Sequence, residues 1–193
     1  NAGVGLTDAP GNTIGGLAAG EQNVISANGF PANNGGIFIL GVGAQGNQLL
    51  GNLIGTDRLG QVALANRYEG IYLINAGSNR IGSELPGGGN LISGNTTRGI
   101  RITNSVGGVI RGNLIGTKLD GTSSLANGQF NVEIEENSNA HELGGLAVGA
   151  GNRIAFSGSG LAAIRVRDLT LNTAILGNLV FSNSGLGLDL SAA

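Results

Sequence analysis

The chain has 193 residues, a hydrophobic fraction of 40% and a formal net charge of −2, with 38 glycines and no cysteine. The sparse and nearly balanced charge excludes a basic surface for nucleic acid, and the lack of cysteine excludes disulfides and thiolate chemistry. No apolar run approaches the length of a membrane span, so we expect no insertion into a membrane. The length of the chain suits a single domain, 1–193.

Short strands of the form apolar–variable–apolar recur along the chain. They are too short for helices, alternate with period two and lie between glycines and asparagines, which is typical of strands. Two further short apolar segments follow most of them, so we expect three strands per coil. The first set begins at intervals of 24 to 34 residues and comprises Val4–Leu6, Ile37–Ile39, Ile71–Leu73, Ile100–Ile102, Val132–Ile134, Ile164–Val166 and Leu188–Leu190.

Longer motifs recur every 61 to 67 residues. GNLIGT occupies 51–56 and 112–117, and the related GNLVFS occupies 177–182. Motifs that begin as NTIGG and NVIS recur twice in degenerate form. This period divides the chain into three super-repeats of two coils each, at about 3–66, 67–127 and 128–190.

The strands are too short to form stable hairpins. Stacking the coils satisfies their backbone hydrogen bonds, because equivalent strands then pair in parallel about 4.8 Å apart. The usual chirality of parallel connections makes the coil right-handed. We predict an all-β fold, a right-handed parallel β-helix (solenoid) with three strands per coil and about six coils. The narrow core is expected to contain Ile14, Ile25, Ile37, Ile39, Leu49, Ile54, Ile71, Leu73, Ile81, Ile92, Ile100, Ile102, Ile110, Ile115, Val132, Ile134, Leu143, Ile154, Ile164, Val166, Ile175, Val180, Leu188 and Leu190.

An asparagine stands just before the third strand of each coil. Asparagine tolerates the left-handed backbone conformation and bonds readily to neighbouring backbone. With one amide per coil, these side chains are expected to form a hydrogen-bonded ladder, which is a structural role. The residues are Asn23, Asn52, Asn90, Asn113, Asn152 and Asn178.

The combined pattern of NxIGG, GNxISGN, GIxI, GNxIGTDxxG and LAN runs from about Gly3 to Leu190. It resembles the bacterial cell-surface proteins known as right-handed parallel β-helix repeat proteins, of the pectate-lyase-like superfold. The resemblance implies a secreted or cell-surface location, but it implies no particular reaction. Analogy of fold alone does not assign a function.

The outward positions of the first strand set form two rows, which are the candidate catalytic or ligand-binding site. In a catalytic interpretation, Glu133 and Glu135 are the acid and base of an inverting glycoside hydrolase, since carboxyls two residues apart on a strand suit that reaction. Phe38 and Tyr72 would stack on sugar rings. The rows are Gly5, Phe38, Tyr72, Arg101, Glu133, Arg165 and Asp189, and then Thr7, Leu40, Ile74, Thr103, Glu135, Arg167 and Ser191.

A structural interpretation of the same rows is favoured. Charges alternate in sign from Arg101 through Glu133 and Arg165 to Asp189, and Arg167 lies beside Glu135. Opposite charges on adjacent strands form favourable cross-strand pairs, and pairing with arginine lowers a carboxyl pKa, which disfavours a general acid. Arg101 and Arg165 remain candidate ligand-binding residues together with the two aromatic rings.

No metal or cofactor site is expected. Asp57 and Asp120 lie in equivalent loops at different offsets, and Lys118 takes the place of Asp57, which argues against a repeated calcium site. The single histidine, His141, replaces the asparagine of NTIGG and cannot form a zinc site alone. We interpret it as a corner residue.

An apolar stripe is expected on the outer face of the third strand set. The chain carries inserted loops of two types, at 56–66 and 117–127 and at 15–22, 82–89 and 144–151. In one interpretation the inserted loops fold over this stripe, and in the other a partner covers it. Its residues are Val24, Leu53, Leu91, Leu114, Arg153 and Leu179.

The favoured function is a non-catalytic extracellular or cell-surface structural module. The first and last strands carry no polar capping coil, so we expect either flanking sequence or other copies of the chain to cover them, the latter giving an end-to-end filament. The alternatives are a carbohydrate-binding or adhesive module that takes polysaccharide, and a polysaccharide-cleaving enzyme acting on the first-sheet face.

Overall fold

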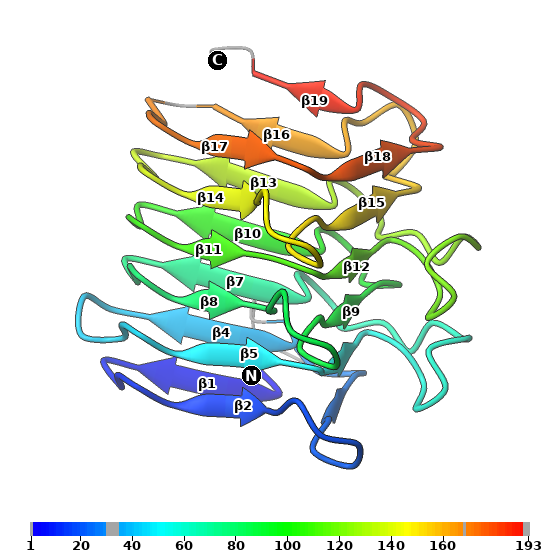
Figure 1. Cartoon of the computed structure of the whole chain (residues 1–193), viewed down its shortest axis with the longest axis horizontal. Coiled ribbons are helices and arrows are strands. Elements are labelled where there is room, and N and C mark those ends of the chain that lie inside the picture. Colours follow the sequence, from blue (N-terminus) through cyan, green and yellow to red (C-terminus); the bar gives the residue numbers. More distant parts are fainter. Residues whose placement is uncertain (1, 30–34, 168, 191–193) are drawn as a thin grey trace.

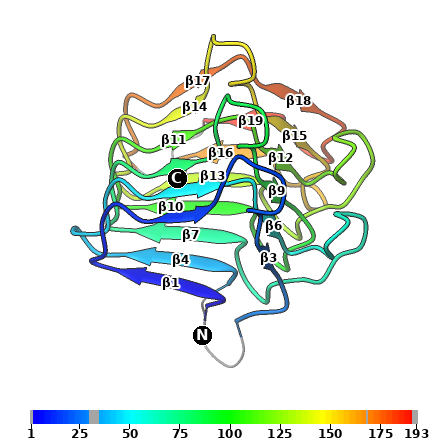
Figure 2. The same ribbon diagram turned by 60° about the horizontal axis from the view of Figure 1, so that its bottom comes forward.

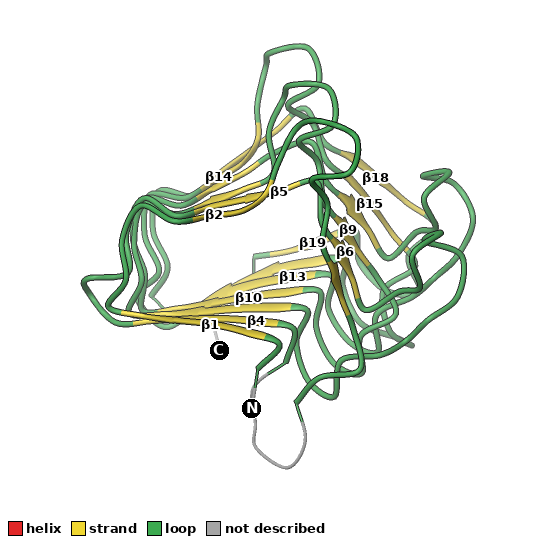
Figure 3. Cartoon of the chain, turned by 90° about the horizontal axis from the view of Figure 1, so that it is seen from below, coloured by secondary structure: helices red, strands yellow, loops and turns green. Residues whose placement is uncertain are grey.

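The computed structural model describes residues 2–29, 35–167 and 169–190, which form an all-β parallel solenoid of three sheets without a helix. Six coils of three strands are stacked in chain order, and one additional strand follows the sixth coil (Figure 1). The first and second sheets lie opposite each other, and the third sheet closes one side (Figure 3). The predicted solenoid with three strands per coil and about six coils is confirmed.

The seven-stranded first sheet contains the strands predicted from the apolar–variable–apolar pattern. Five of them extend one residue further than expected, and the last is one residue shorter. The strands are β1 (Val4–Thr7), β4 (Ile37–Leu40), β7 (Ile71–Ile74), β10 (Ile100–Thr103), β13 (Val132–Glu135), β16 (Ile164–Val166) and β19 (Leu188–Asp189).

The second and third sheets have six strands each and run along the other two sides of the coil (Figure 2). The second sheet consists of β2 (Thr13–Gly15), β5 (Gln48–Leu50), β8 (Arg80–Ile81), β11 (Val109–Ile110), β14 (Glu142–Gly144) and β17 (Ala174–Leu176). The third consists of β3 (Val24–Ile25), β6 (Leu53–Ile54), β9 (Leu91–Ile92), β12 (Leu114–Ile115), β15 (Arg153–Ala155) and β18 (Leu179–Phe181).

The core is a column of stacked Ile, Leu and Val side chains. Ile39, Leu73 and Ile102 are paired in register on adjacent strands and are essentially fully buried, as the repeat requires. The alanines Ala44 and Ala76 also belong to this core, although the sequence pattern did not indicate them. Dense packing of branched aliphatic side chains supplies most of the free energy that stabilises such a narrow interior.

The prediction that two residues at the end of the chain lie in the core is wrong. Leu188 and Leu190 are 40% and 64% exposed, because no described strand stacks beyond β19 to cover them. Ile14, Ile175 and Val180 lie near the two ends of the solenoid and are only partly buried against the core.

The predicted asparagine ladder is confirmed. In each step, the backbone N–H and the side-chain amide of one asparagine both donate to Oδ1 of the asparagine in the next coil. For Asn52 and Asn90, the two donor–acceptor distances are 2.9 and 3.0 Å. The ladder extends from Asn23 to Asn178, and its four inner members are fully buried.

Two further ladders occupy the other corners and were not predicted. The first-sheet ladder precedes the strands of the first sheet and runs through Asn28, Asn66, Asn95 and Asn127. The second-sheet ladder runs through Asn12, Asn47 and Asn79. All three have the same direction: donors point toward the coil that follows.

Candidate functional site

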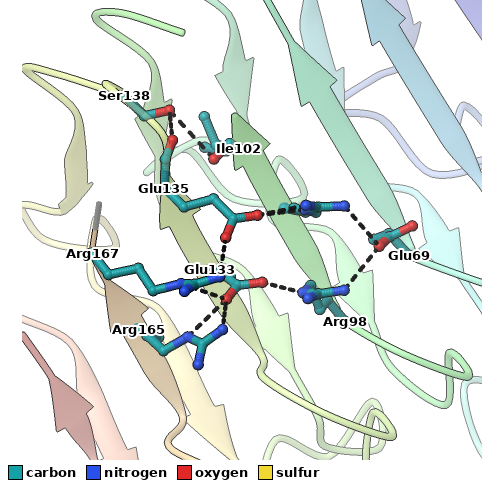
Figure 4. Close-up of polar contacts among 9 residues, drawn as sticks. Glu69, Arg98, Ile102, Glu133, Glu135, Ser138, Arg165 and Arg167 are labelled. Carbon is teal, nitrogen blue, oxygen red and sulfur yellow. Dashed lines mark hydrogen bonds and ion pairs between the residues drawn. The ribbon is translucent and has the colours of Figure 1, made fainter. Parts of the chain in front are cut away.

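The outer face of the first sheet carries a buried ionic cluster of three glutamates and four arginines (Figure 4). Parallel pairing places Arg101 beside Glu133, and Glu133 beside Arg165, as the sequence predicted. We call Glu69, Arg98, Arg101, Glu133, Glu135, Arg165 and Arg167 the first-sheet ionic cluster.

Glu133 lies at the centre of this cluster and is completely buried, although its strand position faces outward. One carboxylate oxygen, Oε2, accepts from Nε of Arg98. The other, Oε1, accepts from Nε of Arg165 at 2.7 Å and lies 3.6 Å from Nε of Arg167. Its burial therefore comes from the arginine side chains that converge on it from other coils.

Glu135 is the second member of the predicted catalytic pair and is only 1% exposed. Its Oε1 accepts from Nε of Arg101 at 2.7 Å, and its Oε2 accepts from Arg167 at 2.8 Å. Burial raises the pKa of this carboxyl, but the hydrogen bonds and charges of both arginines outweigh burial and hold the pKa below its ordinary value. The group is therefore an anion at neutral pH.

The predicted cross-strand pairing of opposite charges is confirmed for two pairs, Glu133 with Arg165 and Glu135 with Arg167. The expected contact between Arg101 and Glu133 is replaced, because Arg101 reaches diagonally to Glu135 instead. The predicted last member of the second row, Ser191, lies outside the described residues.

Glu69 and Arg98 belong to the cluster but were missed in the sequence. Nη1 of Arg98 lies 3.2 Å from Oε1 of Glu69, and Nη1 of Arg101 lies 3.9 Å from the same oxygen. Both residues stand two positions before the start of a first-sheet strand, at β7 and β10. This shared offset on adjacent coils is the signal that would have paired them.

Aromatic rings border the cluster on two sides. The Phe38 and Tyr72 rings lie 5.6 Å apart and are tilted by 51°. The guanidinium of Arg101 lies 4.9 Å from the Tyr72 ring centre, and that of Arg165 lies 3.9 Å from the ring centre of the buried Phe130. The four candidate ligand-binding residues therefore form a half-buried surface in which both arginines are also bonded to glutamates.

The chemistry available to Glu133 and Glu135 follows from these contacts. General acid catalysis by a carboxyl requires a raised pKa and access to the leaving group. Both carboxylates are instead enclosed, and guanidinium donors occupy their oxygens. In this arrangement the cluster binds the coils of β7, β10, β13 and β16 to one another.

His141 is a corner residue, as expected, and it occupies the same corner as the second-sheet ladder, two coils beyond Asn79. Its Nδ1 accepts from the Gly108 N–H at 3.0 Å, and its Nε2 lies 3.0 Å from the Ser105 carbonyl oxygen. Desolvation lowers the pKa of the imidazole. The ring is therefore neutral at pH 7 and carries its proton on Nε2, because Nδ1 accepts and Nε2 donates.

The loop aspartates are used within their own loops. Asp57 accepts backbone N–H groups from Gln61 and Val62 at 2.7 and 2.9 Å, and Asp120 accepts those of Thr122 and Ser123. These bonds lower the pKa of both carboxyls. Within residues 2–29, 35–167 and 169–190, no group of three His, Cys, Asp or Glu side chains is arranged to hold a metal ion.

The apolar stripe on the third sheet is covered at its centre. Leu53 and Leu91 are only 5% and 2% exposed, and Gly60 of the first inserted loop lies directly against Leu91. The second inserted loop contacts the stripe through Gly121, whose carbonyl accepts from Nε of Arg153 at 2.9 Å. The interpretation that the loops fold over the stripe is confirmed there.

The class of protein that this fold defines is the parallel β-solenoid with three sheets. Comparison of the chain with protein-family models, curated proteins and solved structures found no match. No helix in the described part of the chain is long and apolar enough to span a bilayer.

Proposed function

We propose that the chain is a non-catalytic structural module of the right-handed parallel β-helix repeat type, located outside the cell or on its surface. The location rests on the sequence motifs alone. The non-catalytic role rests on one observation: the carboxylate of Glu133 is wholly buried and both of its oxygens accept from arginines. A buried ion pair that is fully bonded stabilises one arrangement of the coils.

The role of Glu133 is tested by measuring stability and catalysis on the same variant. Glu133→Gln leaves Arg98 and Arg165 without their carboxylate, so we expect a loss of about 3–5 kcal/mol in the free energy of unfolding. Glu136→Gln, at an exposed position just after β13, is the matched control and should leave stability unchanged within about 0.5 kcal/mol.

The catalytic alternative is tested by reducing-sugar release and by formation of unsaturated uronates on neutral and acidic polysaccharides. We expect no turnover by the wild-type chain. Turnover by the wild-type chain would refute the proposal, and its loss in Glu133→Gln at a temperature where this variant is folded would assign it to Glu133.

A second candidate function is carbohydrate binding, favoured by the half-buried rings of Phe38 and Tyr72. Aromatic faces of this kind stack on sugar rings, and Arg101 beside them suits an acidic sugar. A glycan array with the wild-type chain and Tyr72→Ala tests this function. Tyr68→Ala is the control, because this ring is similarly exposed and lies outside the two rows.

A further inference from the structure

The three corners that carry the asparagine ladders have unsatisfied polar groups at both ends of the solenoid. In the coil β1–β3, no described residue donates to the Oδ1 atoms of Asn12, Asn23 and Asn28, although each of these residues donates to the next coil. At the other end, the corresponding positions in the coil β16–β18 are Thr173, Asn178 and Asn183. The Thr173 hydroxyl is buried and has no partner within the described chain. One end therefore presents acceptors, and at the other end no described residue accepts from the backbone N–H groups of Thr173, Asn178 and Asn183 at the same three corners.

Loops between the second and third sheets repeat every second coil and stack on one another. They cover 15–22, 82–89 and 144–151, in the first, third and fifth coils. A Cβ on Gly87 would lie 2.2 Å from the Leu17 carbonyl oxygen, and one on Gly149 would lie 2.4 Å from that of Glu84. The next carbonyl in this series is that of Leu146, whose side chain is 89% exposed.

The first loop contains the glycine that would continue this series. Gly20 aligns with Gly87 and Gly149 in the three loops, and its φ of 91° is positive like their values of 81° and 83°. A Cβ on Gly20 would meet nothing within 4 Å, so its own chain leaves the contact unused. Because the loop recurs in odd coils, a first coil placed after the sixth coil brings Gly20 onto Leu146.

We infer that the solenoid associates head to tail with a second copy of this chain, whose coil β1–β3 follows the coil β16–β18. The inference rests on the proposed structural role and identifies the partner and the junction. In the junction, β2 pairs with β17 and β3 pairs with β18. Asn12, Asn23 and Asn28 of the second copy then accept from Thr173, Asn178 and Asn183. The apolar side chains that are half-buried at both ends complete one continuous core.

The junction requires β19 to leave its place. The first sheet has seven strands and the other two have six, so β19 occupies the position that β1 of the second copy needs on β16. β19 has only two residues, and Leu188 is 40% exposed. β1 has four residues and offers Val4 and Leu6 to the same core positions. The incoming strand therefore replaces a shorter and less buried one.

Cross-linking tests the register of the junction. Extending the observed pairing of β14 with β17 places Thr13 of the second copy beside Ala174, and both positions are exposed. In one molecule these residues lie five coils apart, about 24 Å, which a short bis-maleimide does not span. The chain has no cysteine of its own. Thr13→Cys/Ala174→Cys should therefore give a series of covalent oligomers, and Thr13→Cys/Leu119→Cys should give none above background.

Sedimentation over a concentration series tests the loop contact. Leu146→Asp places a negative charge where Glu21 of the second copy lies, so the association constant should fall at least about tenfold. Leu146→Lys should retain association, and Val42→Asp, at a 76% exposed site outside the junction, should not change it. Leu188→Ser loosens β19 and should raise association.

These results separate the junction from the proposed function. Folded chains that stay monomeric at every concentration, or equal cross-linking of both cysteine pairs, would overturn the junction and leave the non-catalytic role standing. Glycan turnover would overturn the role without affecting the junction. A decrease in association with Leu188→Ser would show that β19 is not displaced.

Discussion

His141 fills a gap in the second-sheet ladder, and removing its ring should reveal how much the ladder stabilises the fold. Asparagines occupy this corner in the first three coils, but the fourth coil has Gly108, which has no side chain. The imidazole of His141, only 2% exposed, reaches into that space and bonds the Gly108 N–H and the Ser105 carbonyl. The imidazole of His141 thus takes the place of the asparagine side chains that the ladder would otherwise have at 108 and 141.

His141→Ala should lower the free energy of unfolding by about 2–4 kcal/mol, because it leaves the buried Gly108 N–H unbonded, removes one of the two bonds to the Ser105 carbonyl and opens a cavity. For a chain of this size the melting temperature should fall by roughly 4–16 °C. Gly108→Asn alone should also destabilise, by about 1–3 kcal/mol, since a Cβ there would lie 2.9 Å from Nδ1 of His141.

The double variant Gly108→Asn/His141→Asn tests the reasoning directly. It rebuilds an uninterrupted ladder from Asn79 onward, and the backbone at Gly108 does not have a positive φ that would disfavour asparagine. We therefore expect the double variant to be more stable than either Gly108→Asn or His141→Asn, a coupling that chemical denaturation of the variants measures. If the destabilisation in the double variant equals or exceeds that of Gly108→Asn plus His141→Asn, the ladder interpretation of His141 is incorrect.

Three further predictions follow from the same contacts. Because burial lowers the pKa of His141, the contribution of this residue to stability should be complete above the ordinary pKa of about 6.5 and decline as the pH falls below it. Thermal melts should show this loss in the wild type and not in His141→Asn. Glu135 has a lowered pKa, so its contribution should be present above about pH 4.5 and be lost as the pH falls through the lower folded value; Glu135→Gln should flatten the acid limb of the same melting profile. Gly116→Ala should destabilise the fold by more than about 1 kcal/mol, since φ is 80° and a Cβ would lie 2.0 Å from the Ala155 carbonyl oxygen. The control is Gly5→Ala, where a Cβ meets nothing within 4 Å, and this variant should be neutral or slightly stabilising in denaturant titrations.

The repeated offset of apolar residues was sufficient to predict the solenoid. Residues such as Ile39, Leu73 and Ile102 recur at matching positions, and only stacking buries all of them while pairing every short strand. The same offset placed Asn52 and Asn90 in one ladder. Local sequence determines these features because each coil repeats the environment of the one before it.

Contacts at the corners and on the outer face depended on the tertiary structure. Glu69 and Arg98 lie outside the strands. The contacts of Arg98 with Glu69 and Glu133 therefore depend on how the backbone turns between sheets, which period-two alternation does not describe. The burial of Glu133 likewise arises from three arginines on two other coils, Arg98 before β10 and Arg165 and Arg167 at β16. At the end of the solenoid, Leu188 fits the core pattern yet remains exposed, because burial requires a neighbouring coil on both sides and the pattern of a single strand contains no information about that neighbour.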